Sequence, residues 1–279
     1  MRVTVWKLGG SVLVDVHSYH ECARLIANRL RSDPDAGIVV VVSARFGETD
    51  ELLSLATSLT RQPEGPTLDL LWSTGEIRSA ATLALCLQAA GVRAAALDVH
   101  QTGIYCTDGL YVDPAPLGRA LAGHDVVVVP GFLACGAGSA VVTLGRGGSD
   151  LSAVVIAAAL RADRCELIKD VPGYFTTDPS RDTQAEHLVT IDYERALQMA
   201  REGCALVQAA ALDTAWRADM TLVVRALDDS RCTIVTSRVA DALAHFTAVQ
   251  EGDARGVSAV HAGKGTLDVR FEDAPVQSS

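Results

Sequence analysis

A glycine-rich loop that runs directly into an alanine-rich segment is the feature that most constrains this chain. Residues 143–150 read TLGRGGSD, and residues 151–160 form an apolar run with the length of a helix. Glycines allow positive φ and let the backbone approach a ligand closely. Ser149 and Asp150 stand where helix caps belong, and the start of a helix favours an anion. Arg146 adds a planar cation suited to a carboxylate or phosphate. Taken alone, such a loop is equally typical of a simple tight turn.

The remaining pattern predicts a parallel sheet that is covered on both faces. Continuous apolar strands are predicted at residues 3–7, 37–43, 125–130, 165–169 and 221–226, and helical segments at 18–30, 51–59, 68–90, 193–202 and 207–217 separate them. Strands that alternate with helices through short connections form a doubly covered parallel sheet. Polar loops follow the strands at residues 7–11, 43–50 and 170–179, at the edge where such sheets bind ligands. Short strands are predicted again at 245–250, 256–260 and 266–271.

Composition excludes several classes of function. The 279 residues carry a formal net charge of -10, and no cluster of lysines and arginines stands out, which argues against nucleic acid or an anionic membrane as the main partner. The seven cysteines are scattered without a CxxC pair, as expected for small buried hydrophobic residues in a reducing compartment. No signal peptide and no membrane-spanning apolar run is recognised. We therefore expect a soluble, cytoplasmic protein.

Six segments carry a resemblance to a known family. They are VWKLGGS at 5–11, VVSA with TDELL within 41–53, STGE at 73–76, VVVVPGF at 126–132, TLGRGGSD at 143–150 and DVPGYFTTDP at 170–179. Their identity and order resemble the amino acid kinase family, and within it most closely the catalytic part of the aspartokinases, over about residues 1–236. Several ordered matches are far more specific than one motif.

The resemblance implies an α/β fold, a three-layer αβα sandwich with a mainly parallel central sheet. Residues 1–160 would form the half that binds the amino acid, and residues 161–236 the half that binds ATP. Residues 237–279 would be a short, partly disordered C-terminal extension, too short for a pair of regulatory ACT domains and at most a remnant of one, so feedback control through such domains is not expected. Family members are usually homodimers or larger, and the Ala- and Leu-rich face at 80–90 is a candidate interface or part of the core. Mg²⁺ would be carried by the nucleotide, with no protein metal site.

The resemblance also assigns roles to individual residues. Lys7 would neutralise charge on the transferring phosphoryl group, the main requirement of phosphoryl transfer. Arg146 would pair with the α-carboxylate of the substrate, and Glu76 and Asp150 would hold its ammonium, with Asp150 also organising Lys7. The catalytic residues are then Lys7 and Asp150; the substrate-binding residues are Ser43, Thr49, Glu76, Arg146 and Ser149; the nucleotide- or phosphate-binding residues are Gly9, Gly10, Ser11, Gly147, Gly148, Lys169, Asp170, Phe175, Asp178 and Arg181.

The chain departs from the aspartokinase pattern on the nucleotide side. Lys169-Asp170 replaces Thr-Asp, Phe175 replaces Tyr, and Ser180 stands where an Arg is usual. A phosphate-binding lysine is absent, because Ala205 occupies its position. Loss of one cation beside a triphosphate costs a few kcal/mol of transition-state stabilisation. We hypothesise that Lys169 or Arg181 supplies the replacement charge. The N-terminal KLGGSV is also one residue shorter than the aspartokinase motif, as in acetylglutamate and glutamate kinases.

These observations favour an ATP-dependent kinase that converts L-aspartate to 4-phospho-L-aspartate. Two alternatives stay open: a catalytically weak or inactive member that binds an amino acid or anion as a partner subunit, and a kinase for another small acid. A Lys169 side chain directed into the phosphate site would favour the kinase, and one turned outward would favour the binding subunit.

Overall fold

The computed structural model describes residues 2–145, 147–204, 206–227, 231–239, 259–262 and 266–269, the last two segments by their backbone. Arg146, Ala205 and the strand predicted at 245–250 lie outside these residues.

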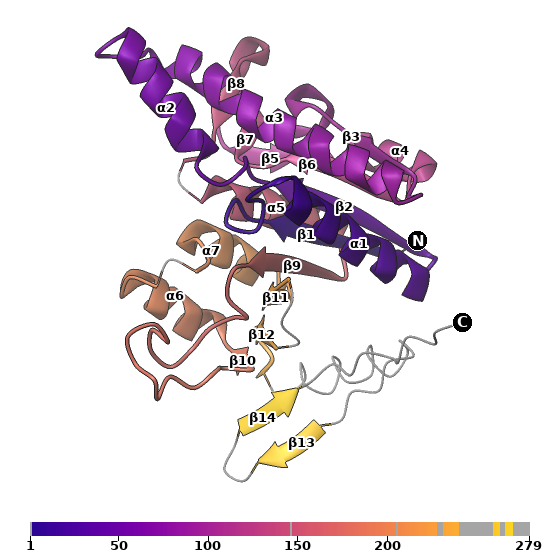
Figure 1. Cartoon of the computed structure of the whole chain (residues 1–279), viewed down its shortest axis with the longest axis vertical. Coiled ribbons are helices and arrows are strands. Elements are labelled where there is room, and N and C mark those ends of the chain that lie inside the picture. The colour runs from indigo at the N-terminus through magenta and orange to yellow at the C-terminus, as the bar shows by residue number, and fades with distance from the viewer. Residues whose placement is uncertain are drawn as a thin grey trace.

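An eight-stranded sheet forms the centre of the molecule (Figure 1). Its strand order is β10-β12-β11-β9-β1-β2-β6-β3. Every neighbouring pair is parallel except β11 and β12, which are antiparallel. The strands are β1 (Arg2–Leu8), β2 (Ala36–Val42), β3 (Ala94–Ala96), β6 (Val126–Pro130), β9 (Arg164–Lys169), β10 (Thr190–Ile191), β11 (Leu222–Ala226) and β12 (Cys232–Val235). Because β1, β2, β6 and β9 run in one direction, their carboxyl ends meet at one edge, where the polar loops lie.

Helices cover both faces of this sheet, which gives the predicted three layers. Within β2, Ile38 and Val40 face a core shared with α1 and α3, whereas Val39 and Val41 face a core shared with α4 to α7. Strict alternation of buried side chains explains why an all-apolar strand is stable only between two helical layers. The helices are α1 (Val16–Ser32), α2 (Glu48–Leu59), α3 (Gly65–Ala89), α4 (Ala115–Gly123), α5 (Gly148–Leu160), α6 (Tyr193–Arg201) and α7 (Ala209–Arg217). In Figure 1, α6 and α7 lie beside β9 to β12, on the other side of β1 from α2.

A second sheet of four strands, in the order β5-β4-β7-β8, leads into the glycine-rich loop. Its strands are β5 (Leu110–Val112), β4 (Ile104–Cys106), β7 (Leu133–Cys135) and β8 (Val141–Thr143), and the short 3₁₀ turns η1 (Val99–Gln101) and η2 (Ala137–Ser139) connect to it. Thr143 donates its hydroxyl to Asp69 of α3 at 2.9 Å, which holds the end of β8 against that helix. A separate antiparallel pair, β13 (Ala259–Ala262) and β14 (Thr266–Val269), matches two of the three strands expected near the C-terminus.

The structure corrects several expectations from the sequence. Ser149 and Asp150 are not caps, because α5 already begins at Gly148 and Gly147 is its N-cap, with φ 75° and no side-chain capping bond. Helix α2 begins at Glu48 rather than at residue 51, so the polar loop before it is shorter. Strands β10 and β12 were not expected; β10 has two residues, too few for a periodic pattern. The segment at residues 80–90 divides between core and surface: Ala80, Leu83, Ala84, Cys86 and Leu87 are buried, whereas Leu85 is a large exposed side chain.

Candidate active site

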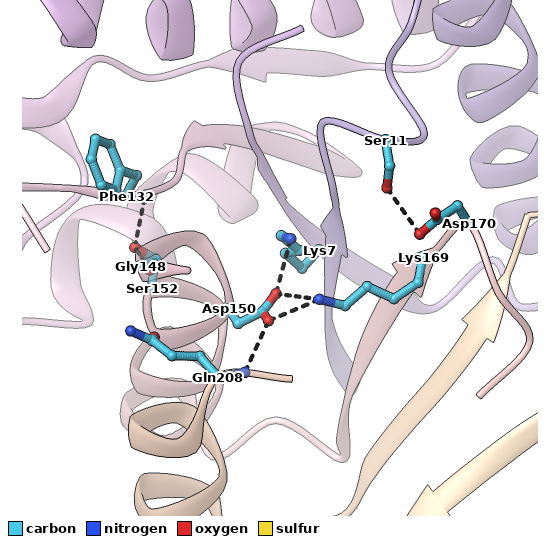
Figure 2. Close-up of polar contacts among 9 residues, drawn as sticks. All are labelled: Lys7, Ser11, Phe132, Gly148, Asp150, Ser152, Lys169, Asp170 and Gln208. Carbon is cyan, nitrogen blue, oxygen red and sulfur yellow. Dashed lines mark hydrogen bonds and ion pairs between the residues drawn. The ribbon is translucent and has the colours of Figure 1, made fainter. Parts of the chain in front are cut away.

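Two lysines and one aspartate from three separate elements meet at the carboxyl edge of the sheet. Lys7 lies near the end of β1, Lys169 ends β9, and Asp150 lies in the first turn of α5. The Lys7 Nζ is 2.9 Å from Asp150 Oδ1, and the Lys169 Nζ is 2.8 Å from Oδ2 and 3.0 Å from Oδ1. Figure 2 shows both ammonium groups directed at this one carboxylate. The sequence-predicted catalytic pair is thus brought together with Lys169, which the sequence placed on the nucleotide side.

Burial and neighbouring charges shift the pKa values of Asp150 and Lys169. Asp150 is 3% exposed, and burial alone would raise the pKa of its carboxyl group, but the charges and hydrogen bonds of Lys7 and Lys169 outweigh burial and lower that pKa to about 2. Burial, together with the charge of Lys7, lowers the pKa of Lys169, and Asp150 partly offsets this shift. Two ammonium groups share this one buried carboxylate, and the charge of the exposed Asp170 also acts on Lys169. Within the buried cluster itself, positive charge exceeds negative charge, which favours an anion.

The backbone N–H of Gln208 completes the surroundings of Asp150. It points at Oδ2 from 3.4 Å, just before the start of α7. Both oxygens of Asp150 therefore already have donors from the protein. The arrangement suits Asp150 for holding the two lysines in place better than for receiving a substrate ammonium.

The backbone turn after β1 packs closely at its two glycines. A Cβ on Gly9 would lie 3.3 Å from the Lys7 Nζ, and one on Gly10 would lie 2.9 Å from the carbonyl oxygen of Ala44. The exposed Ser11 donates its hydroxyl to Asp170 Oδ1 at 3.2 Å, which links the turn after β1 to the loop after β9. Gly9 thus places the backbone of the turn directly beside the Lys7 ammonium group, an arrangement that suits a phosphate group.

The glycine-rich loop places the start of α5 against the end of β6. Gly145 and Gly147 both have positive φ, and the Gly148 N–H donates to the Gly145 carbonyl at 2.9 Å. Ser149 is buried against Gly131, where a Cβ would lie only 2.8 Å from the Ser149 Cβ. Because Arg146 lies outside the described residues, its pairing with a carboxylate stays a prediction.

Two successive hydrogen bonds connect the segment after β6 to the first turn of α5 (Figure 2). Phe132, which has φ 67°, donates its N–H to Ser152 Oγ at 3.0 Å, and Ser152 donates to the Gly148 carbonyl at 3.0 Å. A left-handed conformation is uncommon for a bulky residue. The PGF segment is therefore held in an unusual turn that anchors the helix carrying Asp150.

Glu76 lies on α3, in the half of the chain that is expected to bind the amino acid. It is 4% exposed, and its carboxyl group takes a hydrogen bond from the backbone of Ala44. Burial raises the pKa of Glu76 to about 8; the charge of Glu48 adds to the shift, and Ala44 and Lys7 oppose it. Of the other residues expected here, Ser43 is half-buried at the end of β2 and Thr49 is exposed in the first turn of α2.

Glu48, which the sequence reasoning missed, is the other buried carboxyl group on this side. It is 5% exposed and forms an ion pair with Arg78 of α3. A glutamate beginning a helix normally interacts with the helix dipole from the solvent. No pattern in the sequence signals its burial, because that depends on how α2 packs against α3.

The loop after β9 carries the remaining predicted nucleotide residues, at some remove from the cluster. Phe175 is half-buried and packs edge-on against His187, with ring centroids 5.3 Å apart. Asp178 accepts hydrogen bonds from Ser180 and pairs with Arg181 at 3.3 Å, and the Arg181 side chain is 85% exposed. Lys169 contacts Asp150, whereas Arg181 contacts its own loop. Of the two cations considered as replacements, Lys169 is the one in the cluster.

The described chain is thus a three-layer α/β sandwich with two lysines and one aspartate clustered at the carboxyl edge of its central sheet. The chain belongs to the amino acid kinase family, whose model matches residues 2–226.

Curated relatives and solved structures agree with this assignment. An aspartokinase of Thermus thermophilus is 39% identical over 232 residues, covering 81% of this chain and 56% of that protein. The aspartokinase of Geobacillus stearothermophilus is 34% identical, covering 86% and 60%. The structure of aspartate kinase from Synechocystis is 35% identical with a TM-score of 0.77, covering 85% of this chain and 40% of that one. The UMP kinase of Ureaplasma parvum, at 17% identity and a TM-score of 0.63, shares the fold over 85% of this chain and 99% of its own. This chain thus spans less than two thirds of the length of these aspartokinases.

Two kinds of feature were not found among the described residues. None of the helices in the described ranges is long and apolar enough to cross a membrane. Within the same ranges, no three histidine, cysteine, aspartate or glutamate side chains gather in a way that could hold a metal ion.

Proposed function

We propose that this chain phosphorylates the side-chain carboxylate of an amino acid with ATP, and that its acceptor is L-aspartate, which becomes 4-phospho-L-aspartate. The observation that carries the proposal is the buried Lys7–Asp150–Lys169 cluster beside the glycine turn of residues 9 and 10. Relatives named aspartokinase at 34–39% identity support the choice of acceptor.

The cluster has the charge that phosphoryl transfer needs. In this reaction a carboxylate oxygen of the acceptor forms a bond to the γ-phosphorus of ATP, and the bond from that phosphorus to the bridging oxygen breaks, so that ADP leaves. Lys7 and Lys169 would stabilise the charge on the transferring group, and Asp150 would keep both ammonium groups in position before substrates arrive. Mg²⁺ bound to the nucleotide phosphates would neutralise further charge. The residues present fit a triphosphate, since two ammonium groups converge on one carboxylate and the Lys7 ammonium lies directly beside the backbone of the glycine turn.

At the part of the site that binds the acceptor, we propose that Glu76 binds the substrate ammonium and that Arg146 binds its α-carboxylate. Ser43, Thr49 and Ser149 would be further substrate-binding residues. Glu76 suits this role because its carboxyl group is buried and, among the described residues, its Oε2 has no hydrogen-bond partner. An incoming ammonium would supply that missing donor. Asp150, whose oxygens are both engaged, is left with the positioning role.

We also propose which part of the chain binds which substrate. Residues 1–160 would bind the acceptor and residues 161–236 the nucleotide, through Asp170, Phe175 and Asp178 around Lys169. Residues 237–279 would be a short C-terminal extension, at most a remnant of an ACT domain. We also expect a homo-oligomer: Leu70, Ile77 and Leu85 form an exposed apolar stripe at helical spacing along α3.

Hydroxylamine trapping tests the proposal directly. The protein is incubated with Mg·ATP and, in separate reactions, aspartate, glutamate, N-acetylglutamate or no acid, and both ADP and acyl hydroxamate are measured. We expect hydroxamate with aspartate in a one-to-one ratio to ADP. Product with glutamate or N-acetylglutamate instead would identify another acceptor. If no acid gives product and ATP does not bind, the kinase proposal is wrong and the chain is a binding subunit.

A further inference from the structure

Glu48 is a buried carboxylate with only part of its bonding capacity used. A buried charged group is costly unless its hydrogen bonds are satisfied. Its ion pair with Arg78 of α3 engages Oε1, and the Arg78 side chain itself is largely exposed. Oε2 is buried and, within the described part of the chain, has no hydrogen-bond partner.

The carboxyl groups of Glu48 and Glu76 meet around the same backbone segment. A Cβ on Gly75 would lie 3.2 Å from the Glu48 carboxyl carbon and 3.2 Å from the Ala44 Cβ. The backbone of Ala44 is also the hydrogen-bond donor to Glu76. Gly75 therefore leaves room for Glu48 to reach in beside Ala44, next to the residue that we assign to the substrate ammonium.

Two buried carboxyl groups at one place, each with an unpartnered oxygen, form an incomplete arrangement. The charge of Glu48 contributes to the raised pKa of Glu76, and a cation that arrives between them opposes this effect and favours the ionised form of Glu76. An ammonium group has three donors, no acceptor and a positive charge, so it can donate to both free carboxyl oxygens and offset their charge. A neutral donor would supply hydrogen bonds without the charge, and an anionic group would be repelled.

We propose that Glu48 is a specificity-determining residue which, together with Glu76, forms a two-carboxylate receptor for the acceptor's ammonium group and so selects an amino acid over the same diacid without its amine. This inference rests on the proposed function, because it concerns the same acceptor site. The competing explanation is structural: Glu48 would serve only to tie α2 to α3 through Arg78.

Three variants separate these explanations. Glu48→Gln keeps the shape and an oxygen for Arg78 but removes the charge, and Glu48→Asp keeps the charge on a shorter side chain. Glu51→Gln is the matched control: it makes the same change three residues further along α2, where the side chain is exposed and pairs with Arg45 on the surface. The kinetic constants for L-aspartate, succinate and ATP are measured for each variant, together with the thermal midpoint.

For Glu48→Gln we expect the KM for aspartate to rise about tenfold, in keeping with the loss of one charge-assisted contact. The kcat and the KM for ATP should stay within about twofold, since the phosphoryl-transfer groups are untouched. The preference for aspartate over succinate should fall by the same factor as the KM rises, and Glu48→Asp should restore part of it. Equal changes for both acids, or a lower thermal midpoint with unchanged preference, would overturn the inference.

Binding measurements keep this test separate from the test of the proposed function. If the wild-type protein turns over no acid, calorimetry of aspartate and succinate binding replaces the kinetics. Aspartate binding that weakens in Glu48→Gln, with succinate unaffected, would support the receptor even though the kinase proposal had failed. Absence of any aspartate binding to the wild-type protein would overturn both.

Discussion

The Lys169 Nζ lies 2.8 Å from Asp150 Oδ2, and the same carboxylate receives Lys7 on its other oxygen. A lysine at the end of β9 thereby enters the cluster from a strand adjacent to that of Lys7. This contact gives the chain a second buried ammonium group although Ala205 stands where a phosphate-binding lysine would be expected.

Lys169→Ala should therefore abolish most turnover. Removal of one preorganised charge at a transition state typically costs about a hundredfold or more in kcat. Steady-state ADP release coupled to hydroxamate formation measures the effect. Arg181→Ala, which removes the exposed cation of the neighbouring loop, should change kcat by less than about threefold, in keeping with the small energies of exposed ion pairs. The reverse ranking of the two variants would show that Arg181 is the replacement cation.

Asp150→Asn should weaken both stability and activity. It leaves two buried ammonium groups without a counter-charge, which costs about 3 kcal/mol or more in the free energy of unfolding. Urea unfolding of the purified variant measures this. Glu166→Gln is the matched control, because Glu166 is another buried carboxylate between two cations, Arg164 at 2.7 Å and Arg225 at 3.0 Å, on the opposite face of β9. It should lose comparable stability while retaining turnover per folded molecule.

Acid should remove the contribution of Asp150 in a defined pH range. Its pKa is about 2 in the folded protein and 3.8 for an unperturbed side chain, so the unfolded chain takes up the proton first as the pH falls. The stabilisation is fully present above about pH 4 and is lost between there and pH 2, amounting to about 2 kcal/mol. The difference in unfolding free energy between the wild type and Asp150→Asn should accordingly shrink from pH 5 to pH 3. A constant difference would contradict the assigned shift.

Glu76 should have the opposite effect on the ligand-free protein. Its pKa is raised from 4.5 to about 8, so between these values the folded state holds a proton that the unfolded state has released. Stability then falls as the pH rises from about 4.5 to 8, by a few kcal/mol in total. The thermal midpoint of Glu76→Gln should match the wild type near pH 4.5 and exceed it at pH 8. An equal offset at both pH values would indicate a packing effect instead.

The same raised pKa predicts how acceptor binding responds to pH. Glu76 can attract an ammonium fully only when ionised, so the KM for aspartate should fall about tenfold per pH unit between pH 6 and 7 and level off above pH 8. Initial rates at saturating ATP across this range measure it. Succinate, which lacks the ammonium, is the control and should not show the fall. A flat profile for aspartate would remove Glu76 from the ammonium site.

Local pattern was enough to predict the layers of this protein and several residues of its site. All-apolar strands such as β2 are stable only between two helical layers, and such strands can be recognised as runs of consecutive apolar residues. The glycine turn after β1 and the loop before α5 mark the edge where parallel strands end, so Lys7 and Asp150 could be placed there from the sequence. The helix cap was misplaced because glycine can begin a helix without a side-chain bond, which leaves no residue type to recognise.

The tertiary structure determined which partners the long charged side chains reach. The sequence allowed either Lys169 or Arg181 to supply a replacement charge, and only the packing of β9 beside β1, with α5 above them, directs Lys169 to Asp150. The burial of Glu48 likewise depends on Gly75 of α3, far along the chain, having no side chain in its way. Sequence periodicity reports the burial of neighbouring residues in one element. The meeting of charged groups from different elements depends on how those elements pack, and no local pattern records that.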